Sequence, residues 1–159
     1  MFMFIFLFAC LVSKGLNVAY TVDNPSHAWI ELSESAADRA WRNPKYNSLI
    51  YVKANCGNYF EDRTLQDSLL SLTRGLHTRP PISTESIMIS NREGLFRVLD
   101  SELDGVPVRL GILVVNKNNC LYDFLLISPQ KSFEESIGDF MNTAQSLDTD
   151  INLNRQQKR

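Results

Sequence analysis

Residues 95–114 contain the pattern that most restricts how this 159-residue chain can fold. Asp104-Gly105 is a strong signal for a two-residue hairpin turn, and it separates two strand-like segments, 95–103 and 106–114. In the second segment every other residue is aliphatic: Val106, Val108, Leu110, Ile112 and Val114. Because side chains alternate between the faces of a strand, this hairpin has one apolar face, which another layer must cover.

Five further segments predict strands. They lie at 18–22, 28–32, 48–54, 82–90 and 120–127, and turn-forming residues such as Asn, Gly, Pro and Ser separate them. The last segment, CLYDFLLI, is rich in apolar residues on both of its faces. We therefore expect it to lie in the centre of the sheet.

The segment DRTLQDSLLSLTRGL predicts an amphipathic helix. Its leucines recur at spacings of four, three and four residues, which places them on one side of a helix: Leu65, Leu69, Leu72 and Leu76. Thr64 followed by Asp67 is a start signal, and Gly75 is a stop signal. Pro80-Pro81 excludes a continuation of the helix.

A second helix is predicted near the C-terminus. It begins at a capping box, Ser132 to Glu135, and its apolar residues again form one stripe: Phe133, Ile137, Phe140, Ala144 and Leu147. Two amphipathic helices with short connections to the strands predict an α+β fold, in which a mostly antiparallel β-sheet has both helices packed on it.

The first twelve residues form an apolar run, Met1 to Val12. A membrane-spanning helix needs roughly 20 apolar residues, whereas a shorter run suits the apolar region of a signal peptide. A buried N-terminal strand is the alternative. Leu7-Phe8-Ala9-Cys10 resembles the bacterial lipobox, in which the cysteine is lipidated and becomes the new N-terminus. We predict lipidation at Cys10.

This interpretation divides the chain into four parts. Residues 1–9 are a lipoprotein-type signal peptide, 10–17 a linker, 18–147 a single α+β domain and 148–159 a flexible tail. The formal net charge is −2, which does not suggest a nucleic-acid partner. The expected partners are the membrane, through the N-terminal lipid, and an envelope protein that the sequence does not identify.

Three stretches carry a family resemblance: WRNPKYNSLIYVKANC, DGVPVRLGILVVNKNNCLYDFLLISP and FEESIGDFMNTAQSL. Their order resembles that of small envelope lipoproteins of Gram-negative bacteria, over most of residues 38–147. The resemblance implies a PsbP-like α/β/α sandwich. It also implies a lipid-anchored place facing the periplasm, at the outer membrane rather than the inner one.

With Cys10 lipidated, two cysteines remain, and both lie at predicted strand ends. An oxidising envelope permits a disulfide between Cys56 and Cys120. It would close a loop of about 65 residues, which corresponds to on the order of 4 kcal/mol in the loop-entropy model. Two buried free thiols are the alternative.

No motif in the sequence predicts a metal site, a cofactor or a catalytic residue. Asp100, Glu102, Asp104 and Gly105 imitate the start of a calcium-binding loop, but Gly111 stands where the bidentate glutamate is needed. The two histidines, His27 and His77, have no metal-ligand spacing, which favours surface or structural roles.

Aromatic residues gather in the first third of the chain, including Tyr20, Trp29, Trp41 and Tyr59. They are either core residues or a contact patch for a partner, because Trp and Tyr are frequent in interface hot spots. Three functions follow: a lipid-anchored interaction or accessory module, a carrier of a small apolar ligand such as a lipid between sheet and helix, and an enzyme. We favour the first and expect no enzymatic activity.

Overall fold

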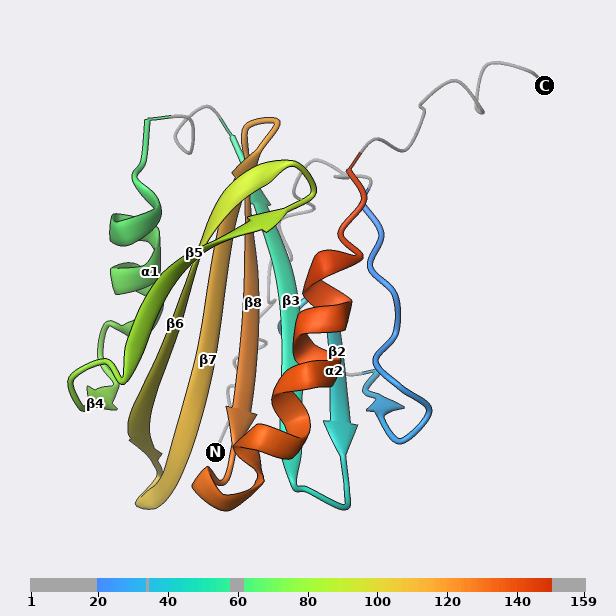
Figure 1. Cartoon of the computed structure of the whole chain (residues 1–159), viewed down its shortest axis with the longest axis vertical. Coiled ribbons are helices and arrows are strands. Elements are labelled where there is room, and N and C mark those ends of the chain that lie inside the picture. Colours follow the sequence, from blue (N-terminus) through green and yellow to red (C-terminus); the bar gives the residue numbers. More distant parts are fainter. Residues whose placement is uncertain (1–19, 34, 58–61, 150–159) are drawn as a thin grey trace, which may run out of the picture.

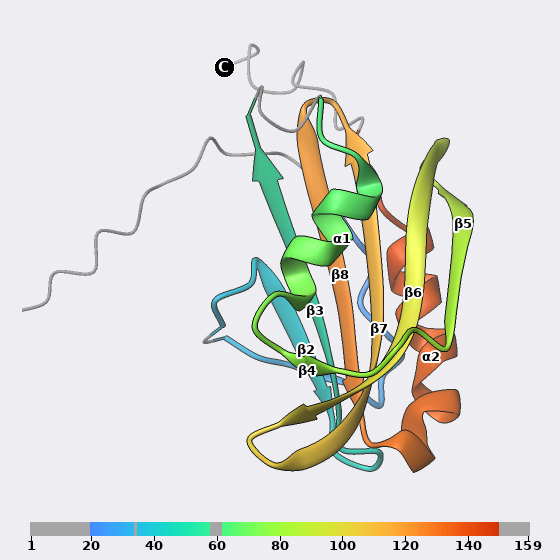
Figure 2. The ribbon, with the colours of Figure 1, turned by 90° about the vertical axis from the view of Figure 1, so that its left-hand side faces the viewer.

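The computed structural model describes residues 20–33, 35–57 and 62–149. They form one antiparallel eight-stranded sheet with a helix on each face (Figure 1). The strand order is β1-β2-β3-β8-β7-β6-β4, and β5 also pairs with β6. Figure 2 shows α1 and α2 on opposite sides of the sheet. The predicted α+β fold, a mostly antiparallel sheet with two helices packed on it, is confirmed.

The elements have the following bounds. The strands are β1 (Ile30–Glu31), β2 (Arg39–Asn43), β3 (Ser48–Cys56), β4 (His77–Thr78), β5 (Ser83–Ile89), β6 (Arg92–Leu103), β7 (Val106–Lys117) and β8 (Cys120–Ser128). The helices are α1 (Leu65–Thr73), the short 3₁₀ helix η2 (Gln130–Ser132) and α2 (Phe133–Gln145).

The centre of the sheet follows the sequence pattern closely. The β6–β7 hairpin turns at Asp104 and Gly105, both of which have positive φ, the backbone conformation that a tight hairpin turn requires. Strand β8 lies between β3 and β7, as its apolar composition on both faces predicted.

The N-terminal part of the sheet differs from the prediction. Of the predicted strand 18–22, only Thr21 forms a bridge, to Asp148, and residues 18 and 19 lie outside the described residues. Segment 28–32 shortens to the two residues of β1, and β2 was not predicted. The reason is that residues 20–29 pack along α2: Trp29 Nε1 donates to Asp139 (2.8 Å).

Helix α2 buries the predicted stripe against one face of the sheet. Phe133, Phe140, Ala144 and Leu147 are buried, and Ile137 is partly buried. The predicted capping box is wrong, because Ser132 makes no side-chain capping bond. Its backbone ends the 3₁₀ helix η2, and the serine side chain is buried.

Helix α1 begins as predicted but covers less of the sheet. Thr64 Oγ1 accepts a hydrogen bond from the backbone N–H of Asp67 (3.0 Å), and Gly75 follows the helix with φ +85°. Leu69 is fully buried, but Leu72 is 38% exposed. Burial of the whole leucine stripe was therefore a wrong prediction, because α1 packs mainly on β6 and β7 and leaves much of the β3–β8 part of this face open.

The two faces of the sheet have separate cores. The larger core lies under α2 and includes Trp41, Phe96, Tyr122 and Phe124. The smaller core lies under α1 and includes alternate residues of β7, namely Val108, Leu110, Ile112 and Val114. These four keep the single aliphatic face that the sequence predicted, while Val106 at the start of the strand is exposed.

A disulfide joins Cys56 to Cys120. The two residues face each other across the β3–β8 pair, with a Cα–Cα distance of 4.0 Å. The structure therefore favours the predicted disulfide over two free thiols. The bond links the end of β3 to the start of β8.

Candidate functional site

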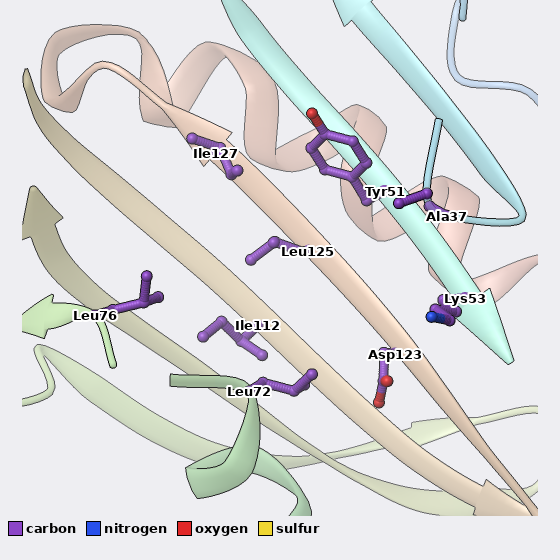
Figure 3. A pocket seen from close by; sticks show the side chains of 10 residues that line it. Ala37, Tyr51, Lys53, Leu72, Leu76, Ile112, Asp123, Leu125 and Ile127 are labelled. Atoms are coloured by element: carbon purple, nitrogen blue, oxygen red, sulfur yellow. The ribbon is translucent and has the colours of Figure 1, made fainter. Parts of the chain in front are cut away.

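A groove opens on the face of the sheet that α1 only partly covers. We call it the α1 groove; its volume is about 350 Å³ (Figure 3). Its lining comes from three strands, α1 and two loops: Ala36, Ala37, Tyr51, Lys53, Leu72, Leu76, Ile112, Asp123, Leu125 and Ile127. Most of these side chains are apolar.

Strand alternation determines which side chains form the floor of the groove. In β8, Asp123, Leu125 and Ile127 point to the α1 face, whereas Phe124 and Leu126 enter the core under α2. The register pairs Lys53 with Asp123. As a result, the two charged residues of the groove come from neighbouring strands, and the apolar floor extends from them along β8 (Figure 3).

One wall of the groove is the exposed side of the α1 region. Leu72 and Leu76 lie near Ile112, on different sides of it (Figure 3). The helix has only nine residues, because Gly75 and the prolines that follow prevent another turn. A short helix on a broad sheet leaves the β3–β8 part of this face open.

Asp123 is the most perturbed group of the groove. Burial raises the pKa of its carboxyl from 3.8 to about 7, although Lys53, a hydrogen bond from Asn55 and Arg63 act in the opposite direction. Asn55 Nδ2 donates to Asp123 Oδ2 (3.2 Å). The other oxygen, Oδ1, is buried and has no hydrogen-bond partner among the described residues. A buried acceptor without a donor is unfavourable, so a donor that reached this oxygen from the groove would stabilise the carboxyl.

The chemistry of the groove suits binding. Its lining contains no histidine, cysteine or serine, and its three polar side chains are Tyr51, Lys53 and Asp123. A concave, mostly apolar site with a few polar groups is typical of small-molecule binding sites. In the described part of the chain, no group of three His, Cys, Asp or Glu side chains is placed to hold a metal ion.

The predicted aromatic patch is not formed by the two tryptophans. Trp41 is 1% exposed and Trp29 is 7% exposed, so both belong to the core under α2. Tyr20 is partly buried, its ring meets that of Tyr122 edge-on, and its hydroxyl donates to Asp38 (2.9 Å). Tyr59 lies outside the described residues. The core interpretation therefore holds for Trp29 and Trp41, and they are not available to a partner.

Of the acidic residues near the β6–β7 turn, Asp100 forms an ion pair with Arg109. Arg109 Nε donates to Asp100 Oδ1 (2.8 Å), and this bond holds the pKa of the Asp100 carboxyl below its usual range. His27 and His77 are both exposed. Cys10, the predicted lipidation site, lies outside the described residues.

The sequence prediction missed Asp123 and Lys53 as candidate binding residues. A signal was present, because Asp123 interrupts a run that is otherwise apolar on both faces. An acid in a central strand must either find partners or face an opening. Asp123 does both, with one oxygen bonded to Asn55 and the side chain lining the groove.

No protein-family model matches the sequence, and no curated protein is significantly similar to it. Solved structures do share the fold. LpqN, involved in cell envelope biogenesis of Mycobacterium tuberculosis, aligns with a TM-score of 0.58 and 12% identity over 84% of this chain and 86% of that protein. The cyanobacterial PsbP of Synechocystis aligns with a TM-score of 0.55 and 12% identity over 86% and 95% of the two chains.

A third neighbour is PA94 from Pseudomonas aeruginosa, with a TM-score of 0.53 and 10% identity over 84% of this chain and 85% of that protein. At these identities the likeness shows the fold alone, which is PsbP-like. Within residues 20–33, 35–57 and 62–149, the helices are too short or too polar to cross a membrane.

Proposed function

We propose that this chain is a non-catalytic accessory protein of the bacterial cell envelope that binds a small apolar molecule in the α1 groove. In this proposal a lipid on Cys10 holds the protein at the membrane, facing the periplasm and at the outer membrane rather than the inner one. The α1 groove is the observation that carries the proposal, because its volume of about 350 Å³ and its apolar lining match small-molecule sites.

Two further observations support an envelope protein. The Cys56–Cys120 disulfide fits an extracytoplasmic location, since such bonds persist in oxidising compartments. One of the proteins that share the fold, LpqN, is involved in cell envelope biogenesis.

A contact with an envelope protein has less support as the primary activity. The resemblance to PsbP-like proteins implies that role, and an exposed aromatic patch would have favoured it. The burial of Trp29 and Trp41 removes two of the four residues of that patch. The groove instead favours a carrier of an apolar ligand between sheet and helix. We therefore propose that the accessory role consists of binding this ligand.

A neutral apolar dye, N-phenylnaphthylamine, tests the groove directly. We expect its fluorescence to rise on binding to the purified domain. Leu72→Asp should weaken binding on the order of tenfold, because it puts a charge on the apolar wall. Leu70→Asp is the matched control: Leu70 is an exposed leucine of the same helix and does not line the groove.

The dye also has outcomes that contradict the proposal. Absence of binding to the wild-type domain, or equal loss in the Leu70 and Leu72 variants, would show that the α1 groove is not the binding site. The variants must first show the same circular dichroism spectrum as the wild type.

The lipid anchor needs a separate experiment in cells. Metabolic labelling with a clickable fatty acid should mark the wild-type protein and leave Cys10→Ser unlabelled. Equal labelling of the two proteins, or a mature N-terminus at Tyr20, would refute lipidation at Cys10 and with it the predicted anchoring.

A further inference from the structure

The geometry points to a specific class of ligand for the α1 groove: an amphiphile with one apolar chain and a head group that donates a hydrogen bond to Asp123, an amine above all. This inference deepens the proposed function and depends on it. Given that the groove is a binding site, the head group of the ligand determines which apolar molecules bind there most tightly.

The shape of the groove sets the direction of the ligand. Ile127, Leu125 and Asp123 follow one another along the same face of β8. The four residue-to-residue steps from Asp123 to Ile127 extend about 13 Å, so the floor runs from an apolar end at Ile127 to the carboxyl of Asp123. Figure 3 shows Leu72 and Ile112 beside this line. A single chain can lie along the floor with its head at Asp123.

The unpaired oxygen of Asp123 determines the head group. Oδ2 accepts a hydrogen bond from Asn55, whereas Oδ1 is buried without a partner among the described residues. Because Oδ1 is shielded from solvent, the carboxyl must turn towards the groove to meet a ligand. A ligand whose head donates a hydrogen bond would then satisfy this oxygen, and a ligand without a donor would leave it unsatisfied. An ammonium head has the advantage, because its charge favours the ionised form of the carboxyl and hydrogen bonds between charged groups are stronger than neutral ones.

Lys53 is the competing determinant, since it lies opposite Asp123 and also lines the groove. An anionic head could pair with its ammonium group. Two features argue against this: the Lys53 side chain is exposed, so its charge is hydrated, and an anionic head there approaches the carboxyl of Asp123. Asp123 is the more buried of the two residues and has the unsatisfied atom.

Displacement of bound N-phenylnaphthylamine by three molecules with the same chain tests the inference. The probes are decylamine, decanol and decanoate, each used below the concentration at which it forms micelles. For the wild type we expect decylamine to bind at least tenfold more tightly than decanoate, with decanol between them. Asp123→Asn should reduce the preference for decylamine over decanoate to about twofold or less.

Two variants serve as controls. Glu135→Gln makes the same acid-to-amide change at an exposed position of α2, on the other side of the sheet, and should leave all three affinities unchanged. Lys53→Gln removes the competing charge. If Asp123 selects the head group, the preference for decylamine persists in Lys53→Gln.

The possible results separate the inference from the proposed function. If decanoate binds best to the wild type and Lys53→Gln abolishes that preference, Lys53 selects the head group and the inference is wrong. If the three probes displace the dye equally, the inference is also wrong, while dye binding still supports the groove. If the dye itself does not bind, the proposed function fails first.

Discussion

The two faces of the sheet are built from the same strands and covered by one helix each, yet one is closed and the other is open. On the α2 face, Trp41 of β2, Ile50 of β3 and Phe124 of β8 are fully or almost fully buried. On the α1 face, the next residues along β3 and β8, Tyr51 and Leu125, are only partly buried and line the groove.

Three differences in cover explain the contrast. Helix α2 has thirteen residues and packs on β3 and β8, whereas α1 has nine and packs on β6 and β7. The segment 20–29 lies along α2 and seals its edge, with Val22 and Trp29 in the core. Figure 2 shows β5 on the same side as α2, and its Ile89 is buried there. The closed face is therefore the structural one, and the open face is available for binding.

The largest expected effect tests whether the closed face stabilises the fold. Phe140→Ala removes a fully buried ring that lies 6.1 Å from the ring of Phe96. We expect a loss of about 3–5 kcal/mol in the free energy of unfolding, measured by chemical denaturation. Leu72→Ala on the open face should lose less than about 1 kcal/mol, because Leu72 is already 38% exposed.

A small loss of stability in Phe140→Ala would contradict the difference between the closed α2 face and the open α1 face. A loss below about 0.5 kcal/mol, against the several kcal/mol expected for a buried ring, would mean that α2 does not pack on the core.

The disulfide should also have a large effect on stability. Cys120 is buried in the core under α2, and its bond to Cys56 closes a loop with a sequence separation of 64 residues. We expect the Cys56→Ser/Cys120→Ser double variant to lose about 2–4 kcal/mol and to melt several degrees lower. Non-reducing mass spectrometry of the wild type should find neither thiol free; two free thiols in a protein purified without reductant would contradict the bond.

Two adjacent leucines give a matched comparison of the faces. Leu126 points into the closed face and is fully buried, whereas Leu125 points into the groove. Leu126→Ala should lose about 2–5 kcal/mol, and Leu125→Ala about 1 kcal/mol. Leu125→Ala should also weaken dye binding, which Leu126→Ala has no direct reason to do. Equal losses of stability would show that both faces are packed to the same degree.

The parts of the fold that the sequence predicted well depend on local signals. Asp104-Gly105 defines its hairpin by turn chemistry, and Thr64 starts α1 through a bond to a residue three positions away. The apolar spacing of Phe133 to Leu147 is likewise local, and its stripe packs against the sheet. Such patterns fix which elements form and which side of each is apolar.

The sequence signals Asp123 as an acid in an apolar strand, but the groove itself could not be predicted, because it depends on contacts between distant parts of the chain. Leucine spacing predicts a stripe on α1 but not which strands lie beneath it, so the exposure of Leu72 was missed. Asp123 and Lys53 meet only through the β3–β8 register. The aromatic cluster shows the same limit: Trp41 had two interpretations until its burial was known.

Asp123 gives the sharpest test of the open face. The carboxyl has a pKa near 3.8 when unfolded and about 7 when folded, because burial disfavours its charge. Between these values the native state keeps a proton that the unfolded state has lost. The stability contributed by the proton is therefore fully present below about pH 4 and is lost as the pH rises through 7.

Asp123→Asn should remove this part of the pH dependence. Asparagine is neutral at every pH, so above pH 7 the variant avoids burying a charge and should be more stable than the wild type. A pKa raised by about three units corresponds to at most about 4 kcal/mol, and water that reaches the partly exposed side chain reduces this value. Below pH 4 the two proteins should be nearly equal. Urea unfolding from pH 4 to 8 measures the difference, with Asp104→Asn at the exposed hairpin turn as the control. If the two curves stay parallel across this range, the carboxyl is hydrated in the folded protein, and the groove is more open to water than its lining indicates.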